Sequence, residues 1–263
     1  MCIRDRVDTA ETVIDKFCNG DLSITDTGSI TFQPDPGDIY VDGSLSNAGS
    51  INSAEVVHAD NELNNSGSIS LDGTNFANIS ADGTLENSGS ITAEGEHVTV
   101  HGDSIVNQED SSIKLSGTAH AYILADGTLE NSGNITAGGE DVTVWGGSIV
   151  NQKGGSISLS GTDYADIWAN VTLENSGSIT AGGENVSVYG DSIVNQEGGS
   201  IEISSAGRAA VAPDKLENHG TVSVKGLNVG FTGNVENYDT ITITENGATK
   251  TLSLIHISEP TRP

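Results

Sequence analysis

The chain has 263 residues, and 37 acidic against 10 basic residues give it a formal net charge of −27. This balance excludes a nucleic-acid partner, because a phosphate backbone is held by clustered Lys and Arg, and the basic residues here are scattered singly. The sequence contains no run of about 18 apolar residues, so we expect no membrane insertion in this segment.

The two ends of the chain differ from the rest. Residues 1–6 (MCIRDR) and 252–263 (LSLIHISEPTRP) resemble translated sequencing-adapter sequence. Such segments are set aside before the fold is considered. We therefore expect residues 7–251 to be an internal fragment of a longer protein, and we do not count the apolar run 254–257 as a terminal strand.

Between these ends the sequence repeats itself. The motif LENSG begins at Leu85, returns at Leu129 and Leu173, and appears as LENHG at Leu216. A second copy, IVNQ, lies inside each of these units and begins at Ile105, Ile149 and Ile193. When the copies are aligned on their Asn, the structural unit is about 21 residues long.

Each unit consists of short segments in which apolar and polar residues alternate, such as 85–87, 90–93 and 98–100, separated by Gly, Asn or Asp. Alternation predicts strands, and no apolar stripe at helical spacing competes with it. Strands of this length at this period predict an all-β fold, a right-handed parallel β-helix (solenoid) of about eleven coils of about 21 residues. At about 4.8 Å per coil, the rod would be about 50 Å long.

The alternation also assigns the inward positions, which form aliphatic columns along the rod. We predict a narrow core without aromatic residues. In chain order its members are Ala77, Ile79, Ala81, Leu85, Ile91, Val98, Val100, Ile105, Ile113, Ala121, Ile123, Ala125, Leu129, Ile135, Val142, Val144, Ile149, Ile157, Ala165, Ile167, Ala169, Leu173, Ile179, Val186, Val188, Ile193 and Ile201.

The Asn of each unit is predicted to have a structural role. We place it at a corner between faces, where left-handed backbone geometry is tolerated, with side-chain amides that bond to one another along the axis. The predicted Asn ladder comprises Asn87, Asn107, Asn131, Asn151, Asn175 and Asn195.

The pattern L-x-N-x-G-x-I, over residues 19–245, resembles the β-helical passenger regions of bacterial autotransporter adhesins and filamentous-haemagglutinin-like exoproteins. The resemblance implies a secreted protein or one displayed on the bacterial outer-membrane surface, with a cell-surface glycan or protein receptor as its partner. We expect a β-helical adhesin stalk. The alternative is the non-catalytic portion of a β-helical polysaccharide-degrading enzyme.

One outward column is the candidate ligand-binding site. It carries one residue per coil and contains both Trp residues of the chain: His101, Leu124, Trp145, Trp168 and Tyr189. Aromatic faces at this spacing suit stacking against sugar rings or a partner protein. The alternative is that these side chains only pack against one another on a β surface.

No residue cluster predicts catalysis, so we expect no enzyme activity and no catalytic residues. A column of Glu86, Glu130, Glu174 and Glu217 recurs in every second coil, too widely spaced for one metal ion. We interpret it as solvated acidic decoration, with weak Ca²⁺ binding left open and no other cofactor. The histidines, including His58, His97 and His120, have no spacing typical of a metal-ligand set, so we predict no metal site.

Overall fold

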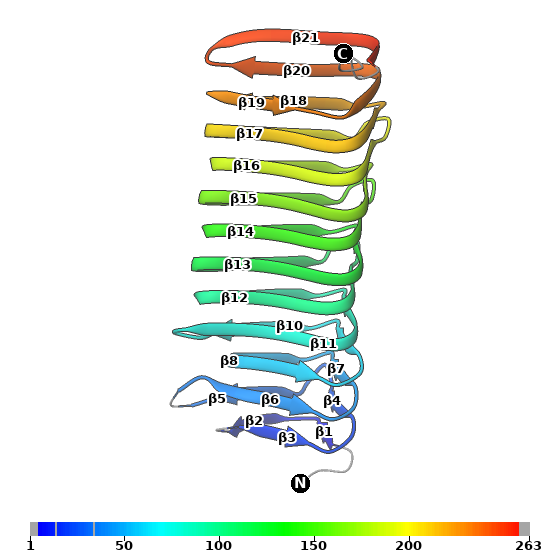
Figure 1. Cartoon of the computed structure of the whole chain (residues 1–263). Helices are drawn as coiled ribbons and strands as arrows, with labels where there is room; N and C mark the ends of the chain where they lie inside the picture. The colour runs from blue at the N-terminus through cyan, green and yellow to red at the C-terminus, as the bar shows by residue number, and fades with distance from the viewer. Residues whose placement is uncertain (1–4, 14, 34, 258–263) are drawn as a thin grey trace.

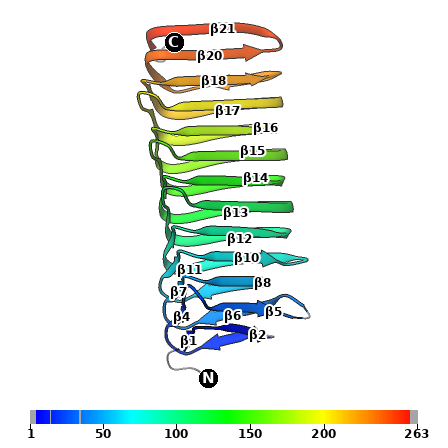
Figure 2. The same cartoon turned by 180° about the vertical axis from the view of Figure 1, so that it is seen from behind.

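The computed structural model describes residues 5–13, 15–33 and 35–257, and it is a rod of stacked coils (Figure 1). The view from behind shows the same stacking on the other side (Figure 2). The strands are β1 (Asp5–Val7), β2 (Ala10–Val13), β3 (Lys16–Cys18), β4 (Leu22–Ile24), β5 (Ser29–Phe32), β6 (Gly37–Val41), β7 (Leu45–Asn47), β8 (Ser50–Ala59), β9 (Leu63–Asn65), β10 (Ser68–Asp72), β11 (Phe76–Asn87), β12 (Ser90–Asn107), β13 (Ser112–Asn131), β14 (Asn134–Asn151), β15 (Ser156–Asn175), β16 (Ser178–Asn195), β17 (Ser200–Asn218), β18 (Thr221–Gly226), β19 (Asn228–Phe231), β20 (Asn234–Glu245) and β21 (Ala248–Ile257). No helix that could cross a membrane occurs in the described ranges.

The coils pair in parallel, each with the coil before it. From β12 to β17 one long strand forms most of a coil, and Ser90, Ser112, Asn134 and Ser156 occupy equivalent positions on successive coils. The repeat along this column is 22 residues. The predicted parallel β-solenoid is therefore confirmed, with about 11 turns and a spacing of about 22 residues. The handedness of the winding stays a prediction.

The core is aliphatic, as the alternation predicts. Every inward residue named from the sequence is buried, with at most 1% of its surface exposed. Phe32 is the exception to the expectation of a core without aromatics, because it is 2% exposed. It follows Ile30 by two residues, the inward position that Leu71 takes after Ile69, so the first coils place an aromatic ring where later coils have a smaller side chain.

The C-terminal end of the described chain differs from the expectation. β21 includes the apolar run 254–257 and pairs antiparallel with β20, with Ile255 opposite Asn237. The prediction that this run forms no strand is therefore wrong. An open last coil exposes a row of unpaired backbone N–H and C=O groups, and a chain that turns back at Asn246 and Gly247, both at positive φ, pairs with them.

The Asn column lies inside the rod. Each Asn side chain donates through Nδ2 to the Oδ1 of the Asn one coil further on at 2.7–2.8 Å, in a series that runs through Asn47, Asn65, Asn87, Asn107, Asn131, Asn151, Asn175, Asn195, Asn218 and Asn237. All of them are at most 3% exposed. The expected left-handed backbone is wrong, because positive φ occurs among the described non-glycine residues only at Ser53, Asp110 and Asn246. An extended backbone lets the amide point inward.

Candidate binding face

One face of the rod is formed by the second segment of each coil, which is His97–Gly102 in β12 and its equivalents in the other coils. Val98 and Val100 are buried, so the side chains of His97, Thr99 and His101 point outward. Each coil thus contributes three outward positions, and in-register pairing aligns them into three columns. We call this surface the aromatic face.

The third column is the candidate site predicted from the sequence. His101, Leu124, Trp145, Trp168 and Tyr189 are direct register partners on successive coils. The rings of Trp168 and Tyr189 lie 5.6 Å apart between centroids, and 51% of Trp168 is exposed. Trp145 donates its ring N–H to Oδ1 of Asn170 at 3.2 Å. The structure therefore brings all five side chains together, with one indole held at its polar edge and the other largely open.

The column is longer than the sequence analysis found. Ser80, His58, Tyr40 and Phe17 continue it in register toward the N-terminus. Phe17 and Tyr40 stack with centroids 5.4 Å apart and planes 6° apart. The signal was an aromatic residue or histidine in most coils of the column, with Ser80 and Leu124 as the exceptions, but the early strands are short and lack the LENSG motif that set the alignment.

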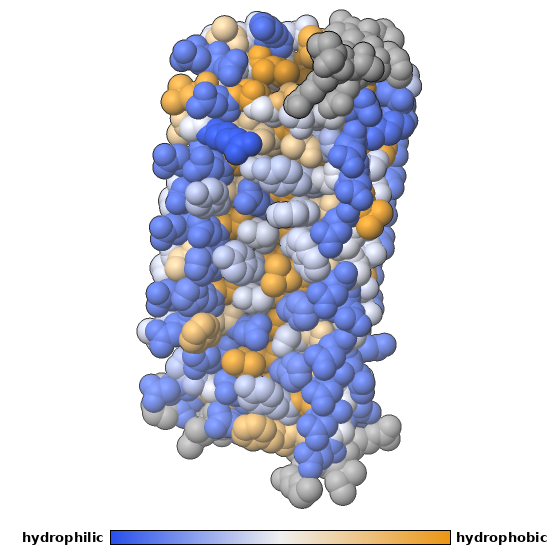
Figure 3. Space-filling model, in the orientation of Figure 1, coloured by the Kyte–Doolittle hydropathy of each residue, from blue (hydrophilic) through white to orange (hydrophobic). Residues whose placement is uncertain are grey.

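A second column, four residues earlier in each coil, is also rich in rings. Phe76, His97 and His120 stack at centroid distances of 5.4 and 4.8 Å, and Tyr164 lies two coils beyond His120. With Tyr122 between the columns, the aromatic face carries both Trp residues and four of the five Tyr residues. The face in Figure 3 shows a light and orange band along the rod between blue margins.

The two ring columns border a surface hollow of about 450 Å³. Tyr164, Trp168 and Tyr189 form its aromatic walls, and its polar lining comprises Asp166, Asn185, Ser187 and Arg208. Burial raises the pKa of Asp166 above 3.8; hydrogen bonding to Ser187 opposes this shift, and the Asp141 charge adds to it. The hollow therefore combines stacking surfaces with hydrogen-bonding groups of both kinds.

The Glu column takes part in hydrogen bonds between coils that the sequence analysis did not predict. Three of the four Glu residues accept a hydrogen bond from a Gln on the next coil: Gln108 to Glu86 at 3.0 Å, Gln152 to Glu130 at 3.1 Å and Gln196 to Glu174 at 2.9 Å. At Glu217 the donors are His219 and Lys215, which lower the pKa of its carboxyl. These carboxylates belong to a network of side-chain hydrogen bonds along the rod.

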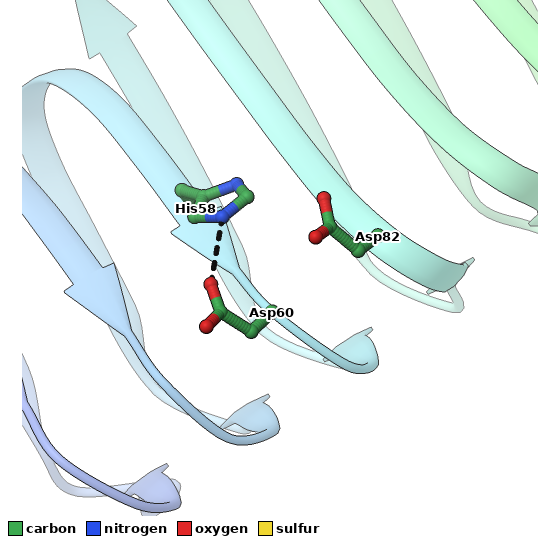
Figure 4. A group of neighbouring side chains, drawn as sticks. All are labelled: His58, Asp60 and Asp82. Carbon is green, nitrogen blue, oxygen red and sulfur yellow. Dashed lines mark hydrogen bonds and ion pairs between the residues drawn. The ribbon is translucent and has the colours of Figure 1, made fainter.

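The spacing of residues in the sequence also did not reveal a group of His and Asp side chains at the N-terminal part of the aromatic face. The ring of His58, at the end of β8, lies beside the carboxylates of Asp60 and Asp82 (Figure 4). The sequence analysis compared histidines with one another, whereas the partners here are carboxylates, one of them from the next coil.

Residues 21–142 match the family described as the BigA fourth domain, a range that covers less than half of the chain. No curated protein and no solved structure matches the chain.

Proposed function

We propose that this chain is a section of a bacterial surface protein, a rigid β-solenoid stalk that binds a glycan on its aromatic face. The match to the BigA fourth domain supports a surface location, because domains of this type belong to bacterial surface proteins. No catalytic role is proposed for the segment.

The stacking of coils supports a role as a stalk. Each coil pairs only with the coils next to it, so the structure extends in one dimension as coils are added. A continuous series of Asn hydrogen bonds and parallel backbone pairing ties the coils together. Such a rod holds its ends at a fixed separation, as a protein that presents a binding surface away from a cell requires.

The hollow between Tyr164 and Tyr189 carries the proposal of glycan binding. Sugar rings have apolar C–H faces that stack on aromatic rings and hydroxyl edges that need hydrogen bonds. Trp168 and the two Tyr residues offer rings for stacking, while Asp166, Asn185 and Arg208 offer hydrogen-bonding groups. Arg208 makes no ion pair or side-chain hydrogen bond with another described residue, so its guanidinium N–H groups remain to bind a ligand.

A glycan array with the full chain, followed by a fluorescence titration of each hit, tests the proposal. Both Trp residues of the chain lie on the aromatic face, so intrinsic Trp emission reports directly on this surface. We expect a hit to shift that emission, and we expect Trp168→Ala to weaken its binding roughly tenfold, which is about 1.4 kcal/mol.

The matched control is Tyr238→Ala. Tyr238 is 51% exposed, as Trp168 is, but it lies in β20 and stacks on His219, away from the aromatic face. The Tyr238→Ala variant should bind the same glycan with the same affinity as the parent chain. Equal binding by Trp168→Ala and the parent chain, or no glycan bound at all, would refute the proposed function.

A further inference from the structure

We propose that His58, Asp60 and Asp82 form a binding site for a divalent transition-metal ion of the Zn²⁺ type. One nitrogen of His58 and one carboxylate oxygen from each Asp all lie within 4.8 Å of one another. This site is independent of the glycan hollow, which lies several coils away between β15 and β17.

The fold fixes the three ligands on two adjacent coils. His58 and Asp60 are two residues apart at the end of β8, and Ser80 of β11 is the register partner of His58 on the next coil. Asp82 follows Ser80 by two residues, so it projects beside Asp60. Figure 4 shows the Asp82 carboxylate turned back toward the other two side chains.

The His58 ring is oriented for coordination. Its Nδ1 lies 2.8 Å from Oγ of Ser80, and its Nε2 lies 3.0 Å from Oδ1 of Asp60. When Nδ1–H donates to Ser80, Nε2 presents a lone pair toward the carboxylates. A hydrogen bond from the far nitrogen to an oxygen is how metal-binding histidines are commonly held in place.

Charge favours a cation at this point. Asp82 makes no hydrogen bond or ion pair with another described side chain, and Glu62 joins Asp60 and Asp82 in lining an adjoining hollow of about 530 Å³. A neutral imidazole leaves two carboxylate charges close together, and a divalent ion neutralises both. The hollow leaves room for water as a further ligand.

The ligand types select the metal. Ca²⁺ and Mg²⁺ prefer oxygen ligands throughout, whereas an imidazole with carboxylates suits Zn²⁺ and neighbouring transition metals. The nitrogen of His58 therefore distinguishes this site from general binding of cations by an acidic chain.

Calorimetric titration of the full chain with Zn²⁺, in excess Mg²⁺ to occupy nonspecific carboxylate sites, tests the assignment. We expect one saturable site, and we expect His58→Asn, Asp60→Asn and Asp82→Asn each to weaken it at least about tenfold. In nitrogen NMR spectra of the histidine rings, Zn²⁺ should shift the Nε2 signal of His58.

His101→Asn is the matched control. His101 lies in the same column two coils further on and, among the described residues, has one carboxylate, Asp126, within 4.0 Å. Its substitution should leave Zn²⁺ binding unchanged. The absence of a saturable site, or equal affinity in the parent chain and His58→Asn, would overturn the assignment, and neither result bears on the glycan hollow.

Discussion

At the scale of single residues, the buried Asn amide performs a task that an aliphatic side chain cannot. Asn131 accepts from Asn107 and donates to Asn151 at 2.8 Å, and its Nδ2 also lies 3.1 Å from the carbonyl oxygens of Gly133 and Ser156. Gly133 lies between β13 and β14, and Ser156 is the first residue of β15. The amide thus links successive coils, and it adds a second donor to the Gly133 carbonyl, which also accepts from the N–H of Ser156 at 2.9 Å.

We therefore expect Asn131→Ala to lower the free energy of unfolding by about 1–3 kcal/mol, since it leaves buried polar atoms without partners. Urea unfolding followed by circular dichroism measures the change. Asn134→Ala is the control, because this Asn is exposed at the start of β14 and should change the value by less than about 0.5 kcal/mol. Equal midpoints for the two variants would show that the ladder contributes little to stability.

Asp166 gives a prediction about pH. Because burial raises its pKa, the folded chain holds this proton more tightly than the unfolded chain does. Ionisation of Asp166 therefore destabilises the fold as the pH rises from about 3.8 through the raised value. We expect Asp166→Asn to be more stable than the parent chain at neutral pH, and the difference to vanish at pH values below 3.8. Thermal unfolding at both pH values measures this, and a variant less stable at neutral pH would contradict it.

At the scale of elements, the glycine of the LENSG motif permits the close stacking of turns. A Cβ atom at Gly177, between β15 and β16, would overlap the carbonyl oxygens of Gln152 and Gly155 on the preceding coil. No side chain fits there without moving two backbone segments apart. The motif therefore encodes the distance between coils as well as the position of the strands.

Gly177→Ala should accordingly lower the free energy of unfolding by about 1–3 kcal/mol. Gly182, within β16, is the matched site, since a Cβ atom there would meet only the carbonyl oxygen of Ser204 at 3.8 Å. Gly182→Ala should be neutral or slightly stabilising, because Ala has less freedom than Gly in the unfolded chain. Chemical denaturation of the two variants measures the difference. A similar loss of unfolding free energy in both variants would contradict the proposed contact.

At the scale of the whole molecule, the net charge of −27 works against the compact rod. Like charges repel along its surface, and salt screens them: the Debye length falls from about 30 Å at 0.01 M to about 3 Å at 1 M. We expect the melting temperature to rise as NaCl increases over this range. Calorimetry with sucrose at matched osmolarity separates screening from the general effect of a cosolute. A melting temperature that stays constant or falls would show that repulsion is not a major cost.

The sequence by itself determined the fold and the inward columns, because a repeat of fixed length puts the same kinds of side chain at equivalent places on every coil. It also predicted the column from His101 to Tyr189, since both Trp residues recur at that spacing. Only the tertiary structure decided which side chains of different coils and columns are neighbours. The hollow bordered by Tyr164 and Trp168 is lined by residues of different coils. The same is true of the group formed by His58 and Asp82. An alignment of repeats compares equivalent positions, and it gives no distance between positions that are not equivalent. The backbone conformation of each Asn was also decided at this level, because an inward amide bonds to the Asn amides of the coils before and after it.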